Sequence, residues 1–154
     1  MTFAPAFTET LRLLAPRLRS MRDDWWLIGS AAVALCGAAP VEVADVDLLT
    51  SIRDARRLRE IWNAPPQAPG PHPLFRSQVH FEWTATPIPV DVMAGFTVNT
   101  AEGWRAVCPR SRERHTCVGA TFYTPARHEL IGILEMIGRP KDRERADLLR
   151  ALAP

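Results

Sequence analysis

The clearest succession of structural signals in the chain is the segment 25–50, WWLIGSAAVALCGAAPVEVADVDLLT. It opens with a short apolar run that stops at Gly29 and Ser30, and the small apolar residues 31–36 that follow predict a buried helix. Residues 45–50 then predict a second strand, and the charged stretch 53–62 predicts an exposed helix. Strand, tight turn, helix, strand and helix in this order indicate a domain of the α/β class.

Further strands and helices are predicted on both sides of this stretch. Leucines recur at near-helical spacing between Phe7 and Leu18, which predicts an opening helix with a kink or an end at Pro16. The proline-rich segment 64–73 predicts a stiff surface loop, and two helices that meet at residues 138–140 close the chain. Three more strands are predicted, the first two as a hairpin, at residues 78–83, 88–92 and 104–109.

These elements fit one domain of α/β (α+β) class over residues 1–154. We expect a small mixed β-sheet with helices packed mainly on one side of it. An N-terminal helix within residues 1–22 and C-terminal helices within residues 126–154 are expected to pack on this core.

Composition excludes several classes of protein. The 47% apolar and 23% charged residues are typical of a soluble globular chain and exclude disorder and fibrous repeats. The formal net charge of +2 does not suggest a surface that wraps a polyanion. No apolar run reaches the roughly 20 residues of a membrane span, and the N-terminus lacks a basic region before an apolar one. We therefore expect a cytoplasmic protein with no membrane partner.

Two acidic residues on one predicted strand indicate a site for chemistry. Asp45 and Asp47 are two residues apart, so their side chains leave the same face while Val46 and Leu48 enter the core. Such a pair repels itself unless a cation lies between its members, and carboxylate oxygens favour Mg²⁺ or Mn²⁺. The alternative is a strand face that merely contacts solvent.

A third acid, Asp91, is the only charged residue in a second apolar strand, IPVDVM. If this strand lies beside the first, three carboxylates converge and can hold two divalent ions in the geometry used for in-line phosphoryl transfer. The alternative is an edge-strand aspartate that faces water or an arginine.

The turn at Gly29 and Ser30 follows a strand and opens a helix. Free backbone N–H groups there could hold a phosphate, with glycine permitting close approach and Ser30 adding a hydroxyl. Equally, Ser30 could be only the N-cap of the helix.

These residues together resemble the nucleotidyltransferase superfamily of the DNA-polymerase-β type. The pattern consists of a hydrophobic-Gly-Ser turn, an Asp-hydrophobic-Asp strand and a later third acid. The tail of the chain is similar to the closing helices of small single-domain bacterial members, including the AbiEii-like and MNT-like groups. The tail segments that carry this likeness are Gly119–Pro125, Leu130–Ile131, Gly138–Asp142 and Ala146–Leu148.

The resemblance implies roles for individual residues. Gly29 and Ser30 would bind nucleotide phosphates, Asp45 and Asp47 would hold two metal ions, and Asp91 would help to activate the attacking hydroxyl. Arg139 or Lys141 is a candidate for a further phosphate contact. The alternative is that the segment Arg139–Asp142 only begins a helix. Leu134 stands where relatives with this tail often carry a lysine.

Two functions from different classes follow. The first is an enzyme that uses Mg²⁺ or Mn²⁺ to transfer a nucleoside monophosphate from a nucleoside triphosphate to a hydroxyl of RNA, protein or a small molecule. The second is a binding or regulatory module of the same fold with little catalysis, such as an antitoxin-like partner of another protein.

Two other features are predicted to be unrelated to these functions. The histidines are scattered without the spacing of a zinc site, which favours surface or core-edge positions. The basic stretch 110–114 could follow a nucleic-acid backbone, but a solvated loop is the favoured interpretation.

Overall fold

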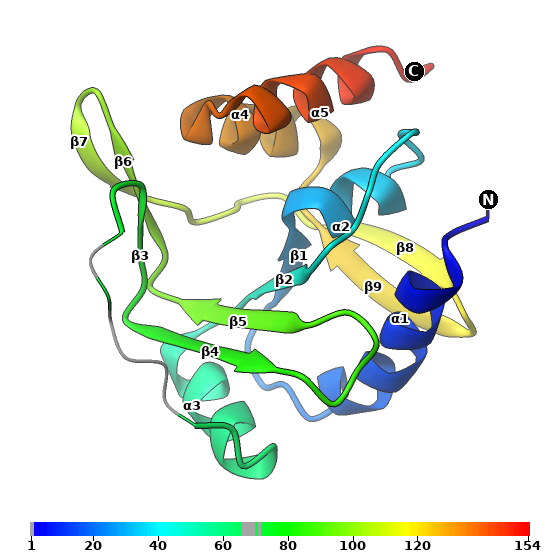
Figure 1. Cartoon of the computed structure of the whole chain (residues 1–154), viewed down its shortest axis with the longest axis vertical. Coiled ribbons are helices and arrows are strands. Elements are labelled where there is room, and N and C mark those ends of the chain that lie inside the picture. Colours follow the sequence, from blue (N-terminus) through cyan, green and yellow to red (C-terminus); the bar gives the residue numbers. More distant parts are fainter. Residues whose placement is uncertain (1, 66–69, 71) are drawn as a thin grey trace.

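The computed structural model describes residues 2–65, 70 and 72–154 (Figure 1). In these residues the helices are α1 (Pro5–Leu18), α2 (Gly29–Leu35), α3 (Ile52–Ile61), α4 (Arg127–Ile137) and α5 (Pro140–Arg150). The strands are β1 (Trp26–Ile28), β2 (Val46–Leu49), β3 (Phe75–Arg76), β4 (Val79–Trp83), β5 (Val90–Ala94), β6 (Thr97–Thr100), β7 (Gly103–Ala106), β8 (Glu113–Cys117) and β9 (Ala120–Thr124). The loop predicted over residues 64–73 lies partly outside the described residues. None of the described helices has the length and apolar character to cross a membrane.

The main sheet has four strands in the order β1-β2-β5-β4. Strand β2 pairs antiparallel with β1 and parallel with β5, and β4 pairs antiparallel with β5. The predicted mixed sheet and its β4–β5 hairpin are therefore confirmed. Two smaller sheets, β3-β6-β7 and β8-β9, flank the main one.

One face of the main sheet is the core of the molecule. Val79, Phe81 and Trp83 of β4 are buried on this face, as alternation along a strand requires. They share one apolar cluster with Leu14 of α1 and Leu58 of α3, so these two helices cover this face. Helix α4 packs instead on α2 and β6, and Figure 1 shows α4 and α5 on the opposite side of the sheet from α3.

The pattern of the sequence did not predict every strand. Strands β6 and β8 were not predicted, because neither contains an apolar run. The strand predicted over residues 104–109 corresponds to β7, which pairs with β6 and ends at Ala106. The predicted solvated loop over residues 110–114 is wrong at its end, because Glu113 and Arg114 begin β8. Arg112 lies with its guanidinium carbon 3.6 Å from the ring centre of Tyr123. Stacking on this ring leaves Arg112 only partly exposed to solvent.

A single buried hydroxyl links the N-terminal helix to the sheet. Thr10 is fully buried, and its Oγ1 donates to the carbonyl of Ala6 at 2.8 Å and accepts from the backbone N–H of Ile88 at 3.0 Å. Ile88 lies just before β5, so this contact fixes α1 against the β4–β5 hairpin.

We expect Thr10→Val to lower the free energy of unfolding by about 1–3 kcal/mol, because the buried N–H of Ile88 loses its acceptor. Urea unfolding followed by circular dichroism measures this change. Thr8→Val, on the same helix but half-buried, is the control and should change the free energy by less than about 0.5 kcal/mol. Equal stability of the two variants would contradict the linking role.

Candidate active site

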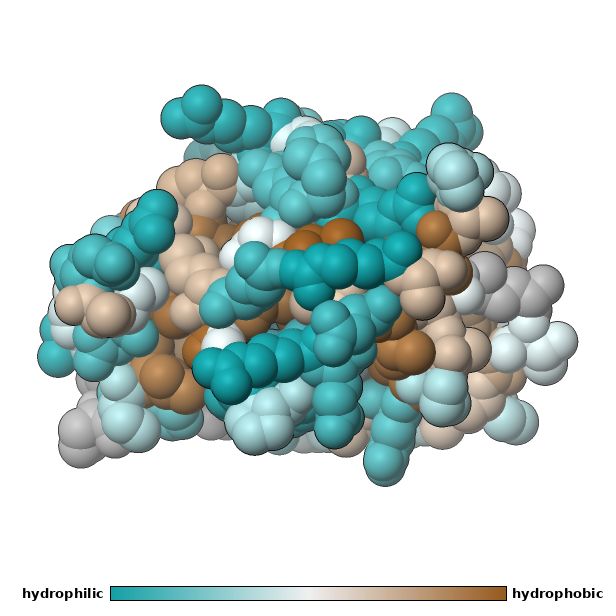
Figure 2. Space-filling model, turned by 90° about the horizontal axis from the view of Figure 1, so that it is seen from above, coloured by the Kyte–Doolittle hydropathy of each residue, from teal (hydrophilic) through white to brown (hydrophobic). Residues whose placement is uncertain are grey.

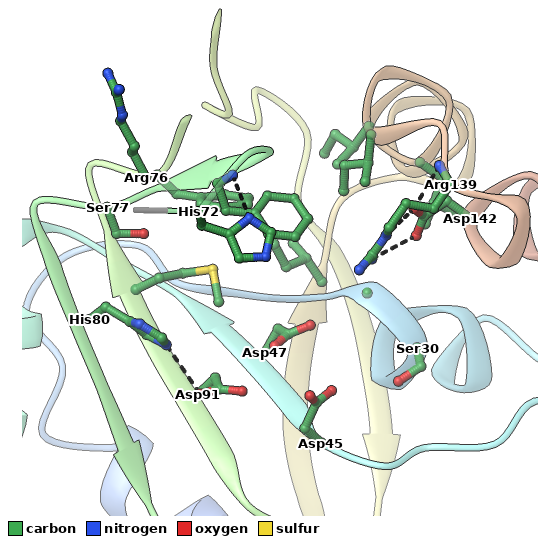
Figure 3. Close-up of a pocket in the computed structure, with 18 of the residues that line it drawn as sticks. Ser30, Asp45, Asp47, His72, Arg76, Ser77, His80, Asp91, Arg139 and Asp142 are labelled. Carbon is green, nitrogen blue, oxygen red and sulfur yellow. Dashed lines mark hydrogen bonds and ion pairs between the residues drawn. The ribbon is translucent and has the colours of Figure 1, made fainter. Parts of the chain in front are cut away.

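Three carboxylates meet on the open face of the main sheet. Asp47 of β2 and Asp91 of β5 are direct partners in the parallel register, and Asp45 immediately precedes β2. Each residue offers an oxygen that lies within 4.8 Å of the other two (Figure 3). Val46 and Leu48 point the other way and are fully buried, as predicted. The structure thus brings together the three acids that the sequence singled out.

Burial and mutual repulsion make this cluster costly to ionise. Burial, followed by the charges of Asp45 and Asp91, raises the pKa of Asp47 to about 7. Burial and then the charge of Asp91 also raise the pKa of Asp45, although cations of α5, Lys141 foremost, oppose this rise. A hard divalent cation would relieve the repulsion, and three carboxylate oxygens at this spacing are a donor set that fits Mg²⁺ or Mn²⁺.

The turn before α2 comes very close to Asp47. Gly29 has a φ of +64°, and a Cβ built on it would lie 2.5 Å from Oδ2 of Asp47. Only glycine fits here without displacing the carboxylate. Ser30 is buried inside α2, and the N-cap position belongs to Ile28, so the N-cap interpretation of Ser30 is wrong.

Gly29→Ala is expected to weaken Mn²⁺ binding by at least about tenfold, because the added methyl forces Asp47 away and the positive φ strains an L-residue. Isothermal titration with Mn²⁺ measures the effect. Gly119→Ala is the control: its φ is also positive, but a Cβ there meets nothing within 4 Å. If both variants bind Mn²⁺ equally well, the close approach at Gly29 does not matter for the metal site.

Helix α5 places cations opposite the acids. Arg139, Lys141 and Arg145 all line the same cavity as the three carboxylates. Asp142 is buried and accepts hydrogen bonds from the Arg139 guanidinium at 2.7 and 3.1 Å, and Arg145 Nη1 lies 3.8 Å from it. The alternative interpretation of Arg139–Asp142 as a helix start also holds, since these two residues form a capping box.

Sequence reasoning missed Arg145 and His80. Arg145 lies one helical turn after Lys141, and its side chain is only 20% exposed. A helical periodicity applied to α5 from Lys141 onward would have found it.

Nε2 of His80 lies 3.2 Å from Oδ1 of Asp91, and this contact is the first cause that raises the pKa of His80. His80 is diagonal to Asp91 across the β4–β5 pair, so only the register of that pair reveals it.

The acids, the Gly29 turn and the α5 cations line one cavity of about 1100 Å³. Leu134 also lines it, so an apolar side chain faces the cavity where the resemblance led us to look for a lysine. Seen from above, apolar residues show between the hydrophilic side chains of this part of the surface (Figure 2). A concave cavity of this size that combines apolar walls with convergent polar groups is the usual form of a small-molecule site.

Solved structures of similar fold are nucleotidyltransferases. TM1012 from Thermotoga maritima, whose description as a nucleotidyltransferase is provisional, matches with a TM-score of 0.72 and 22% identity over 97% of this chain and 93% of that one. The lincosamide antibiotic adenylyltransferase LnuA, solved with lincomycin bound, matches with a TM-score of 0.61 and 13% identity over 94% of this chain and 96% of that one.

A third similar structure is ANT(2'')-Ia in complex with adenylyl-2''-tobramycin, with a TM-score of 0.52 and 14% identity over 92% of this chain and 83% of that one. No family model and no curated protein matches the sequence. The structural likenesses confirm the predicted nucleotidyltransferase fold.

Proposed function

We propose that this protein transfers a nucleoside monophosphate from a nucleoside triphosphate to a hydroxyl acceptor, with Mg²⁺ or Mn²⁺ as cofactor. The observation that carries the proposal is the convergence of Asp45, Asp47 and Asp91 beside the Gly29 turn. Charge neutralisation and positioning are the main tasks of an enzyme in this chemistry. The adenylyltransferases of similar fold support this class of reaction.

In the reaction, the acceptor oxygen attacks the α-phosphorus. The bond from that phosphorus to the oxygen between the α- and β-phosphates breaks, and pyrophosphate leaves. Asp45 and Asp47, together with Asp91, would hold the divalent ions, which supply positive charge that screens the phosphates from the carboxylates. Asp91 would accept the proton of the attacking hydroxyl, with its Oδ1 held by His80.

The triphosphate would lie between the Gly29 turn and α5. The turn offers backbone N–H groups and the buried Ser30 hydroxyl, and α5 offers Arg139, Lys141 and Arg145. Leu134 stands where relatives often carry a lysine, and it supplies no charge. Lys141 and Arg145 line the same cavity, so the phosphates would still contact cations.

Arg145→Ala is expected to raise the KM for the nucleotide by about tenfold, with a smaller effect on kcat, because it removes a cation that contacts substrate and transition state alike. Steady-state kinetics with varied nucleotide measure the change. Arg143→Ala is the matched control, since Arg143 is exposed on the same helix and does not line this cavity. Equal KM values for the two variants would remove Arg145 from the phosphate site.

Incubation with each α-labelled nucleoside triphosphate and Mg²⁺ or Mn²⁺ tests the proposed function. The wild type should bind the nucleotide only with metal and release pyrophosphate when an acceptor is present. The double variant Asp45→Asn/Asp47→Asn should do neither. If the wild type also shows neither metal-dependent binding nor turnover, the antitoxin-like module becomes the better description of this fold.

A further inference from the structure

We propose, as an extension that rests on the proposed function, that the acceptor is an uncharged or anionic small molecule whose hydroxyl is attached to a flat apolar group. Polycationic acceptors would bind more weakly. Two independent features of the cavity carry this inference: an apolar wall beside the acids, and the absence of an uncommitted carboxylate among the described residues that line it.

The apolar wall lines the cavity beside the carboxylates. Its residues belong to one apolar cluster, and each of them also lines the cavity: Ile28, Phe75, Met93, Phe96, Ile133 and Ile137. Such a surface favours an apolar group of the ligand, because contact with the wall removes the apolar area of both from water.

A stacked pair of rings gives this wall a flat, fixed part. The rings of His72 and Phe75 lie 4.9 Å apart at an interplanar angle of 23°. Nδ1 of His72 accepts hydrogen bonds from the backbone N–H groups of Leu74 and Phe75, which holds the imidazole in place. Figure 3 shows His72 projecting over the cavity in the direction of Asp47. A planar ligand group could stack there close to the reacting centre.

The carboxylates of the cavity are all engaged. Asp45, Asp47 and Asp91 face one another and would hold the metal ions. The fourth lining carboxylate, Asp142, is buried against Arg139 and Arg145. By sequence, residues 66–69 and 71 carry no ionisable side chain. A ligand ammonium group would therefore find no free acidic partner among the lining residues that the structure describes.

Besides these acids, cations of α5 line the cavity: Arg139, Lys141 and Arg145. Arg76 also lines it, but its guanidinium carbon lies 4.0 Å from the ring centre of Trp104, outside the lining, and Figure 3 shows its side chain directed away from the acids. Glu82 is the register partner of Asp91 on β4, but it is exposed and does not line the cavity. An acceptor with several ammonium groups would therefore meet cations and engaged acids here, and like charge is an effective means of rejecting a ligand.

The size of the cavity leaves room for such an acceptor beside the nucleotide. Pockets that hold one drug-sized ligand range from about 300 to 1,000 Å³. The cavity of about 1100 Å³ exceeds that range. A small acceptor can therefore contact the apolar wall while the triphosphate contacts α5.

Binding of three probes to the full chain tests the inference. With Mg²⁺ and a non-hydrolysable ATP analogue present, saturation-transfer NMR would compare 4-nitrophenyl β-D-glucopyranoside, its anionic glucuronide counterpart and tobramycin. We expect both aryl glycosides to bind at millimolar concentration, with the aryl protons receiving most of the saturation, and tobramycin to bind at least about tenfold more weakly. The inference would be overturned if tobramycin bound as tightly as either glycoside, or if neither glycoside bound.

An added charge makes the test independent of the probe's shape. Ser77→Asp should strengthen tobramycin binding by about tenfold, because it places a free carboxylate in the cavity lining. The matched control is Ser20→Asp, which makes the same change at an exposed position outside the cavity lining. If both variants bind tobramycin alike, the charge of the cavity does not select the acceptor.

The failure of this inference can be told apart from failure of the proposed function. Titration of the same samples with Mn²⁺ and the ATP analogue reports on the metal and nucleotide sites alone. Loss of that binding contradicts the proposed function, whereas intact nucleotide binding with tobramycin preferred contradicts only the acceptor class.

Discussion

Asp47→Asn should lower the rate of nucleotidyl transfer by about a thousandfold, which corresponds to about 4 kcal/mol of transition-state stabilisation. Asp47 is the innermost of the three acids: it pairs in register with Asp91 and lies against the Gly29 turn. An amide of the same shape keeps the packing but removes the charge that holds a divalent ion.

The control for this experiment is Asp147→Asn, the same chemical change at an exposed position of α5 outside the main cavity. Its transfer rate should equal that of the wild type within about twofold. Pyrophosphate release measured with saturating nucleotide and metal gives the comparison. A rate for Asp47→Asn within tenfold of the wild type would show that the acid cluster is not the reaction centre.

The same substitution should stabilise the metal-free protein at pH 8. Burial and the neighbouring acids raise the pKa of Asp47 from its ordinary value of 3.8 to about 7. The folded state therefore keeps a proton on Asp47 that the unfolded state has already lost, and stability falls as pH rises between about 4 and 7. Asparagine cannot ionise and avoids this loss, which is on the order of 2–4 kcal/mol above pH 7.

Urea unfolding in the presence of EDTA measures this gain. Asp47→Asn and wild type should have similar stability at pH 4, and the variant should be more stable at pH 8. Excess Mg²⁺ should raise the stability of the wild type but not of the variant, since only the native carboxylate binds the ion. A variant that is less stable than the wild type at pH 8 without metal would mean that the carboxylate is not under electrostatic strain.

The part of the fold that sequence reasoning predicted is the part encoded by apolar runs. The strand before Gly29 and the Asp45–Thr50 strand are bounded by turn residues, and their buried positions leave few alternatives. The pair β8 and β9 was not predicted, because Glu113–Cys117 has no apolar run and takes its stability from pairing with Ala120–Thr124. Pairing of this kind depends on tertiary context rather than on local pattern.

The site shows the same division. Asp47 and Asp91 were predictable because each interrupts an apolar strand at a position that must face away from the core, and Asp45 because it lies two residues before Asp47, on the same face. The place of His80 beside Asp91 depends on the register of β4 against β5. That register is set by contacts across the sheet, and the sequence of β4 alone does not specify it.

The proposed reaction requires divalent cations among the three carboxylates, and a crystal structure with Mn²⁺ and a non-hydrolysable nucleoside triphosphate tests this requirement directly. Anomalous difference density at the manganese absorption edge should show the ion coordinated by Asp45, Asp47 and Asp91, with the triphosphate between it and α5. Manganese bound elsewhere, with the three carboxylates uncoordinated while the nucleotide is in place, would contradict the proposed reaction.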